Sequence, residues 1–113
     1  MNISAESYGH AVILNLKGDL TEDALAALRQ AVEHQLENAE VVDLVINLEE
    51  VPFIDSMALE YLLELQDRLA EKFGRVKLAK VDDNVLTILE MTRLRSRFEI
   101  FRDIPEAVKA MQP

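Results

Sequence analysis

The fold of this chain is decided by one stretch near its middle, which reads Leu48-Glu49-Glu50-Val51-Pro52-Phe53-Ile54-Asp55-Ser56-Met57-Ala58-Leu59. Upstream, residues 41–48 are almost continuously apolar, which is typical of a strand buried on both faces. Downstream, apolar residues recur at helical spacing until Gly74, which predicts a helix over Met57–Phe73. The stretch therefore joins a buried strand to a long amphipathic helix, and Ser56 falls at the predicted N-cap.

A serine at the start of a helix has two possible roles. Its hydroxyl lies beside unpaired backbone N–H groups and the positive end of the helix dipole, an environment that accepts a phosphate. Serine is also a preferred N-cap, so its position alone favours a purely structural role. Sequence position therefore makes Ser56 a candidate and no more.

The rest of the chain alternates strands with helices. Two strands over residues 3–7 and 11–16 meet around Gly9, and Thr21 is placed to cap a helix that ends near Asn38. After the central strand and helix we expect a strand over residues 76–81, a helix from Asp82, a strand around 98–101 and a short last helix. Because each crossover helix must bury its apolar face on a sheet, this order predicts an α/β fold with a mixed sheet.

Several motifs in this order resemble the STAS domain, a family named for sulfate transporters and anti-sigma factor antagonists. The resemblance rests on Gly18-Asp19-Leu20, Val45-Ile46-Asn47-Leu48, Asp55-Ser56-x-x-Leu59 and the stretch from Asp82 to Phe101. It implies one compact STAS-like domain over residues 1–113, with a mixed four- to five-stranded sheet and about four helices.

The resemblance also implies a function. Many antagonist members carry Asp-Ser-Ser-Gly-Leu-Gly, and a cognate kinase phosphorylates the serine after the aspartate, which here is Ser56. The chain is thus expected to be a non-enzymatic regulatory protein whose partner is a kinase-type anti-sigma factor.

The chain also departs from that motif. It has Met57, Ala58 and Glu60 where the motif has serine, glycine and glycine, and Thr21 where the family often has aspartate. These differences favour an alternative, a constitutive STAS subunit of a lipid-transport ABC system or of a larger signalling assembly.

A surface around Ser56 is expected to bind the partner. On the central helix, Met57, Glu60, Tyr61 and Glu64 are predicted to face away from a core stripe of Leu59, Leu62, Leu63 and Phe73. Exposed methionine and tyrosine are enriched at interface cores, although a neighbouring loop could instead cover them. The expected binding residues are Asp19, Thr21, Asp55, Ser56, Met57, Glu60, Tyr61 and Glu64.

Charge is distributed unevenly along the chain. The net charge is −9; residues 1–67 carry 14 acidic and 2 basic side chains, and residues 68–113 carry 7 acidic and 10 basic ones. The overall sign disfavours nucleic-acid binding, which needs concentrated positive charge. The acidic half contains Ser56, so it either receives a basic partner or is simply a solvated acidic surface. The cluster of Arg93, Arg95 and Arg97 is expected to be a solvated loop rather than a phosphate site, with an acidic partner segment as the alternative.

Catalytic and metal-binding patterns are missing from the sequence. The chain has no cysteine, and His10 and His34 lack metal-ligand spacing and are expected at the surface. Neither a Gly-x-Ser-x-Gly elbow nor a glycine-rich nucleotide loop occurs. A receiver-like interpretation with Asp55 as phosphoacceptor lacks the acidic pair that would hold Mg²⁺, so Asp55 is expected to accept backbone N–H bonds instead. We therefore expect no enzyme activity, cofactor or metal.

The apolar segments are also informative about location. None approaches the ~18 residues of a membrane span, and the start Met1-Asn2-Ile3-Ser4 shows no secretory signal. We expect a cytoplasmic protein without direct membrane insertion. The oligomeric state, the partner's identity and the pathway stay open at the level of sequence.

Overall fold

Five strands and four α-helices follow one another in the computed structural model, which describes residues 1–111. The last two residues of the predicted 1–113 domain lie outside the described residues. The elements are β1 Asn2–Tyr8, β2 Ala11–Lys17, α1 Glu22–Leu36, β3 Asp43–Glu50, α2 Ser56–Ala70, β4 Arg75–Ala79, α3 Asp83–Met91, a 3₁₀ turn η1 Arg95–Arg97, β5 Glu99–Phe101 and α4 Ile104–Lys109. The sheet order is β1-β2-β3-β4-β5, with β1 antiparallel to β2 and the other pairs parallel. The predicted α/β fold with a mixed sheet is confirmed.

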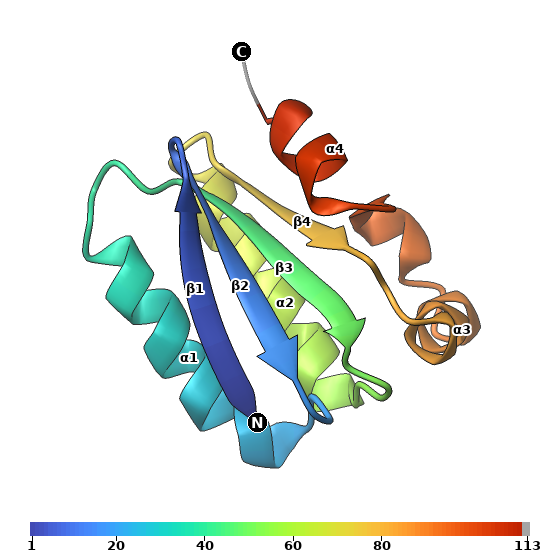
Figure 1. Ribbon diagram of the computed structural model, residues 1–113. Coiled ribbons are helices and arrows are strands. Elements are labelled where there is room, and N and C mark those ends of the chain that lie inside the picture. Colours follow the sequence, from blue (N-terminus) through green and yellow to red (C-terminus); the bar gives the residue numbers. More distant parts are fainter. Residues whose placement is uncertain (112–113) are drawn as a thin grey trace.

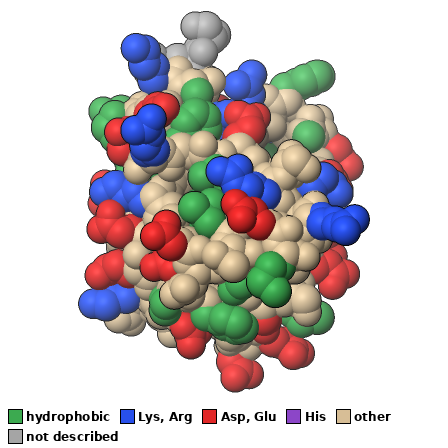
Figure 2. All heavy atoms as spheres, turned by 90° about the vertical axis from the view of Figure 1, so that its right-hand side faces the viewer, with side chains coloured by type: hydrophobic (Ala, Val, Ile, Leu, Met, Phe, Trp, Pro, Cys, Tyr) green, Lys and Arg blue, Asp and Glu red, His purple; other side chains and the backbone are tan. Residues whose placement is uncertain are grey.

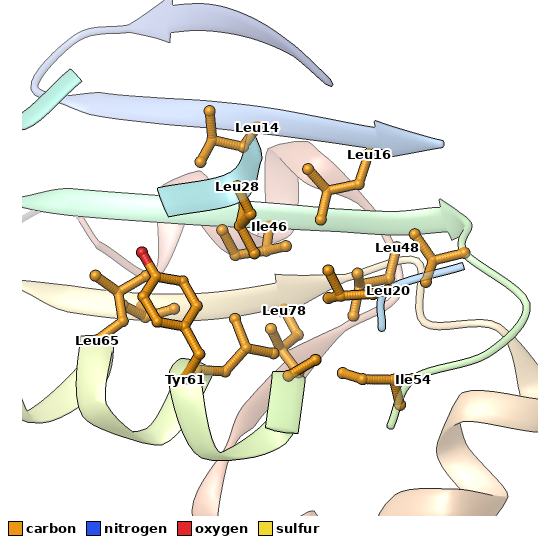
Figure 3. Close-up of a cluster of buried hydrophobic side chains, with 14 of the residues drawn as sticks. Leu14, Leu16, Leu20, Leu28, Ile46, Leu48, Ile54, Tyr61, Leu65 and Leu78 are labelled. Atoms are coloured by element: carbon orange, nitrogen blue, oxygen red, sulfur yellow. The ribbon is translucent and has the colours of Figure 1, made fainter. Parts of the chain in front are cut away.

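Helices α1 and α2 cover one face of the sheet, which we call the helix face (Figure 1). Its core is aliphatic, because alternate residues of β2, β3 and β4 meet the apolar stripes of the two helices. Figure 3 shows this core, in which Leu14 and Leu16 of β2 and Ile46 of β3 lie opposite Leu28 of α1 and Leu65 of α2. This continuous layer holds both helices against the sheet.

The opposite face is closed by α4, which packs against β3, β4 and β5. Its core is smaller and consists of Ala11, Ile13, Val45, Ala79, Ala107, Val108 and Met111. Lys77 is fully buried there; its ammonium pairs with Glu99 and lies 5.0 Å from the centre of the Phe101 ring. Asn47 donates a hydrogen bond to Asn15 at 2.8 Å, and Asn15 donates to Glu6 on β1 at 3.1 Å.

The end of α2 differs from the prediction. Phe73, expected in the core stripe, is 96% exposed because it adopts φ +61° after the helix and points away from the sheet. Gly74 donates its N–H to the Leu69 carbonyl at 2.8 Å, which closes the helix end. A Cβ at Gly74 would lie 1.9 Å from the Val42 carbonyl oxygen, so glycine is needed here for close approach. The prediction that Phe73 packs in the core was wrong.

Candidate functional site

Two loops meet at the end of the sheet where β2 and β3 finish. Leu20 donates its backbone N–H to the Phe53 carbonyl at 2.9 Å, and Asp55 donates to the Leu20 carbonyl at 3.1 Å. A third bond joins the Gly18 N–H to the Glu50 carbonyl at 3.0 Å. These backbone bonds hold the β2–α1 loop and the β3–α2 loop together, so α1 and α2 begin side by side.

One carboxylate caps both helices. Asp55 Oδ1 accepts the Ala58 N–H of α2 at 2.9 Å, and Asp55 Oδ2 accepts the Glu22 N–H of α1 at 2.9 Å. Asp55 is therefore the N-cap of α2. The prediction that Ser56 is the N-cap was wrong by one residue, since Ser56 is the first residue of the helix. Thr21 is the N-cap residue of α1 but its side chain makes no capping bond, because Asp55 takes that role from the neighbouring loop. The expectation that Asp55 accepts backbone N–H bonds is confirmed.

Ser56 is the first residue of α2 and its side chain is exposed. The expected solvent access at a helix start is thus confirmed. Phe53 and Met57, on either side of it in the chain, are 45% and 44% exposed. Ser56 therefore stands at the positive end of a helix of 15 residues, in a segment that also exposes two large apolar side chains.

The other predicted surface residues are mostly accessible. Asp19, Glu60 and Glu64 are exposed, and Thr21 and Asp55 are half-buried. Asp19 and Thr21 lie in the β2–α1 loop, which the backbone bonds tie to the loop before Ser56. Glu60 and Glu64 follow along α2, one and two turns from its start.

Tyr61 is the exception, since only 5% of it is exposed and its ring lies in the core beside Leu65 (Figure 3). The prediction that Tyr61 faces a partner was wrong because α1 packs over this side of α2. The Arg29 guanidinium of α1 lies 4.5 Å from the centre of the Tyr61 ring. Burial raises the pKa of the Tyr61 phenol, and the positive charge of Arg29 partly offsets that rise.

An ion pair between α1 and α2 was not anticipated from the sequence. Arg68 of α2 donates two hydrogen bonds to the carboxylate of Glu33 on α1, one of them 2.9 Å long. These bonds lower the pKa of the Glu33 carboxyl and raise the pKa of Arg68. Both residues occur at polar helical positions, and no local sequence signal pairs side chains 35 residues apart.

The surface charge around the site is predominantly negative. Figure 2 shows the side of the molecule that carries α3 and α4, where basic and acidic side chains are interspersed. Toward its lower end, where β3 finishes and α2 begins, the visible side chains are mainly acidic or hydrophobic (Figure 2). Arg93, Arg95 and Arg97 are all exposed, as expected of a solvated loop, although Arg95 and Arg97 belong to the η1 turn.

Other chemistry has little support in the described residues. Within residues 1–111, no group of three His, Asp or Glu side chains is arranged to hold a metal ion. His10 instead pairs with Asp43 through Nε2 and Oδ2 at 2.8 Å. None of the helices in this range is both long and apolar enough to cross a membrane.

Comparison with known proteins settles the family. The STAS domain model matches residues 2–107. This chain belongs to the STAS domain family. The protein TM1081 from Thermotoga maritima has a similar structure, with a TM-score of 0.88 at 20% identity over 98% of this chain and 95% of the other.

Two further solved structures share this fold. An anti-sigma factor antagonist from Mycobacterium paratuberculosis is similar with a TM-score of 0.85 at 20% identity, over 99% of this chain and 94% of the other. The Bacillus cell fate determinant SpoIIAA in its phosphorylated form gives 0.74 at 19% identity, over 98% and 100%. At such identities the likeness establishes the fold of this chain.

Proposed function

We propose that this protein is a non-enzymatic regulatory binding protein of the anti-sigma factor antagonist type, and that Ser56 is its phosphorylated residue. The observation that carries the proposal is the exposed Ser56 hydroxyl at the first position of α2, directly after Asp55. A kinase reaches such a hydroxyl without any unfolding. The similarity of the fold to SpoIIAA, which is known in a phosphorylated and an unphosphorylated form, supports this type of function.

The proposed partner-binding surface comprises both loops and the exposed side of α2. Its residues are Asp19, Thr21, Phe53, Asp55, Ser56, Met57, Glu60 and Glu64. Phe53 and Met57 supply accessible apolar area, and the acids around them favour a partner with basic residues. A kinase-type anti-sigma factor in the same cytoplasm fits this surface, because its docking would bring the Ser56 hydroxyl to its own phosphate donor.

Phosphorylation would act through charge. A phosphate adds about −1.5 to −2 charges, which the N-terminal dipole of α2 tolerates within the protein. At a docked interface, the same charge would be desolvated beside Asp55 and Glu60, and it would oppose binding because in this proposal no basic group of the partner lies directly opposite Ser56. The phosphorylated form should therefore keep its fold and lose its partner.

The first experiment asks whether Ser56 is the acceptor. The purified protein is incubated with ATP and the kinase-type anti-sigma factor encoded in the same genome, and phosphopeptides are mapped by mass spectrometry. We expect one phosphate on Ser56 and none in Ser56→Ala. The chain has three other serines, Ser4, Ser7 and Ser96, and phosphate on any of these in place of Ser56 would refute the assignment.

The second experiment measures partner affinity by calorimetric titration. Ser56→Asp should weaken binding about thirtyfold, or about 2 kcal/mol, because it places an unpaired charge in the interface. Ser56→Ala should bind nearly as wild type, and because Asp55 is the helix cap it should also melt nearly as wild type. Ser96→Asp is the matched control on the exposed η1 turn, and Tyr61→Phe tests a buried position. Equal affinities for all variants would instead favour the constitutive STAS subunit.

A further inference from the structure

The two edges of the sheet differ in how they are protected. β5 is only three residues long, and the chain on either side of it forms η1 and α4. β1 is seven residues long, pairs with β2 without any register shift, and contains no proline, lysine or arginine. Short strands, bulges, prolines and lysines are the usual means of preventing edge-to-edge pairing. β1 has none of these, so its outer backbone N–H and C=O groups are available to another strand.

The helix face leaves β1 largely uncovered. Ile3, Ala5 and Ser7 lie on this face, since they pair with Leu16, Leu14 and Val12 of the aliphatic core. Ile3 is half-buried, yet Ala5 and Ser7 are exposed, as is every other residue of the strand. An open groove separates β1 from α1, with Ile3 on one side and Ala27 and Ala31 on the other. A strand added beside β1 would lie along this groove.

We propose that two copies of this chain associate by pairing their β1 strands antiparallel about Ala5. This inference concerns a surface apart from Ser56 and does not depend on the proposed function. A two-fold axis through Ala5 pairs all seven residues of Asn2–Tyr8, so no backbone group of the strand is left outside the ladder. Ala5 then faces Ala5 of the other copy, Ile3 faces Ser7, and Asn2 faces Tyr8.

The charge pattern fits this register. Glu6 is the single charged residue of the strand, and the axis at Ala5 places it opposite Ser4 of the other copy. The two carboxylates therefore do not oppose each other, whereas an axis at Glu6 would bring them face to face. On the helix face, Ile3 of each copy lies at the groove beside α1, and Ala5 adds a small side chain at the axis. The result is a continuous sheet through both copies.

The test is a charge swap at the axis, read by sedimentation over a range of protein concentrations. Wild type should shift from monomer toward twice the monomer mass as its concentration rises. Ala5→Glu and Ala5→Lys should each weaken self-association about tenfold or more, because each places two like charges in direct opposition. An equimolar mixture of the two variants should associate again. Ala70→Glu, the same change at an exposed alanine ending α2, should behave as wild type.

Three results would overturn the proposal. The first is a wild type that stays monomeric at every concentration. The second is association that persists unchanged in both Ala5 variants, which would place the interface elsewhere. The third is a monomeric wild type that binds a different protein through β1, while Ala5→Glu does not bind that protein. Circular dichroism verifies that each variant is folded, and folding is expected because Ala5 is exposed.

Discussion

The two faces of the sheet are held to their helices by different kinds of contact. On the helix face, α1 and α2 pack on an unbroken aliphatic layer, and charged side chains appear only at its rim, as in Glu33 and Arg68. On the opposite face, the six-residue α4 closes a smaller cluster that includes a buried lysine, and the neighbouring β1–β3 area is a polar ladder. Stability should therefore depend on apolar packing alone on the helix face, and on both packing and charge pairing on the face that α4 closes.

The largest effects are expected from cavities in the two cores. Leu62→Ala on the helix face and Val45→Ala on the α4 face each remove a fully buried side chain, so each should lower the free energy of unfolding by roughly 2–4 kcal/mol. Leu62→Ala should be the costlier, because it removes more volume from the larger cluster. Urea titration gives both values. Glu60→Ala, an exposed change on α2, should be close to neutral, and a loss below about 0.5 kcal/mol in either core variant would contradict the assigned packing.

The buried lysine gives a sharper test of the α4 face. Glu99→Gln leaves the Lys77 ammonium buried without its counter-charge and should destabilise the protein by about 1–2 kcal/mol, a modest value because Glu99 is 61% exposed. Lys77→Met removes the charge together with the need for a partner, and it should be neutral or stabilising.

The control for this pair lies at the surface. Glu49→Gln breaks the exposed ion pair with Lys80, whose charged atoms are 3.0 Å apart, and should change stability by less than about 0.5 kcal/mol. Urea titration measures the free energy of unfolding of both variants. If Glu99→Gln lowers it no more than Glu49→Gln does, the burial of Lys77 does not strengthen the contribution of the Lys77–Glu99 pair to stability.

Much of the helix face could be predicted from the sequence, because each of its elements has a local signal. The apolar run of β3 and the helical periodicity after Ser56 can both be read within a short window of sequence, although the burial itself comes from distant elements. Tyr61 was misplaced because the buried stripe of α2 runs through Ala58, Tyr61 and Leu65, on the side where α1 lies. The periodicity of apolar residues shows that α2 has a buried side, but the packing of α1 decides how many residues that side includes.

The contacts that could not be predicted join residues far apart in the chain. Asp55 caps α1 from 33 residues away, and a cap of its own helix is all that the local sequence indicates. Lysine is a residue that usually faces water, and nothing in the local sequence marks Lys77 as different, yet it is buried on the sheet face that α4 closes. In both cases the sequence pattern is correct locally and the tertiary neighbour changes its outcome.

The smallest effect expected concerns pH and the polar rim of the helix face. Hydrogen bonds from Arg68 lower the pKa of Glu33 in the folded protein. A carboxyl with a lowered folded-state pKa stabilises the fold at pH values above its unfolded pKa, and this stabilisation is lost as the pH falls through the folded pKa. Because both side chains are about half exposed, the contribution should amount to a few tenths of a kcal/mol.

Glu33→Gln should therefore be slightly less stable than wild type at neutral pH and equal to it in acid. Urea titrations across this pH range measure the gap, with Glu60→Gln as an exposed control on α2. A gap that stays constant with pH would mean that the carboxylate charge of Glu33 does not contribute, and that its link to α2 is one of packing alone.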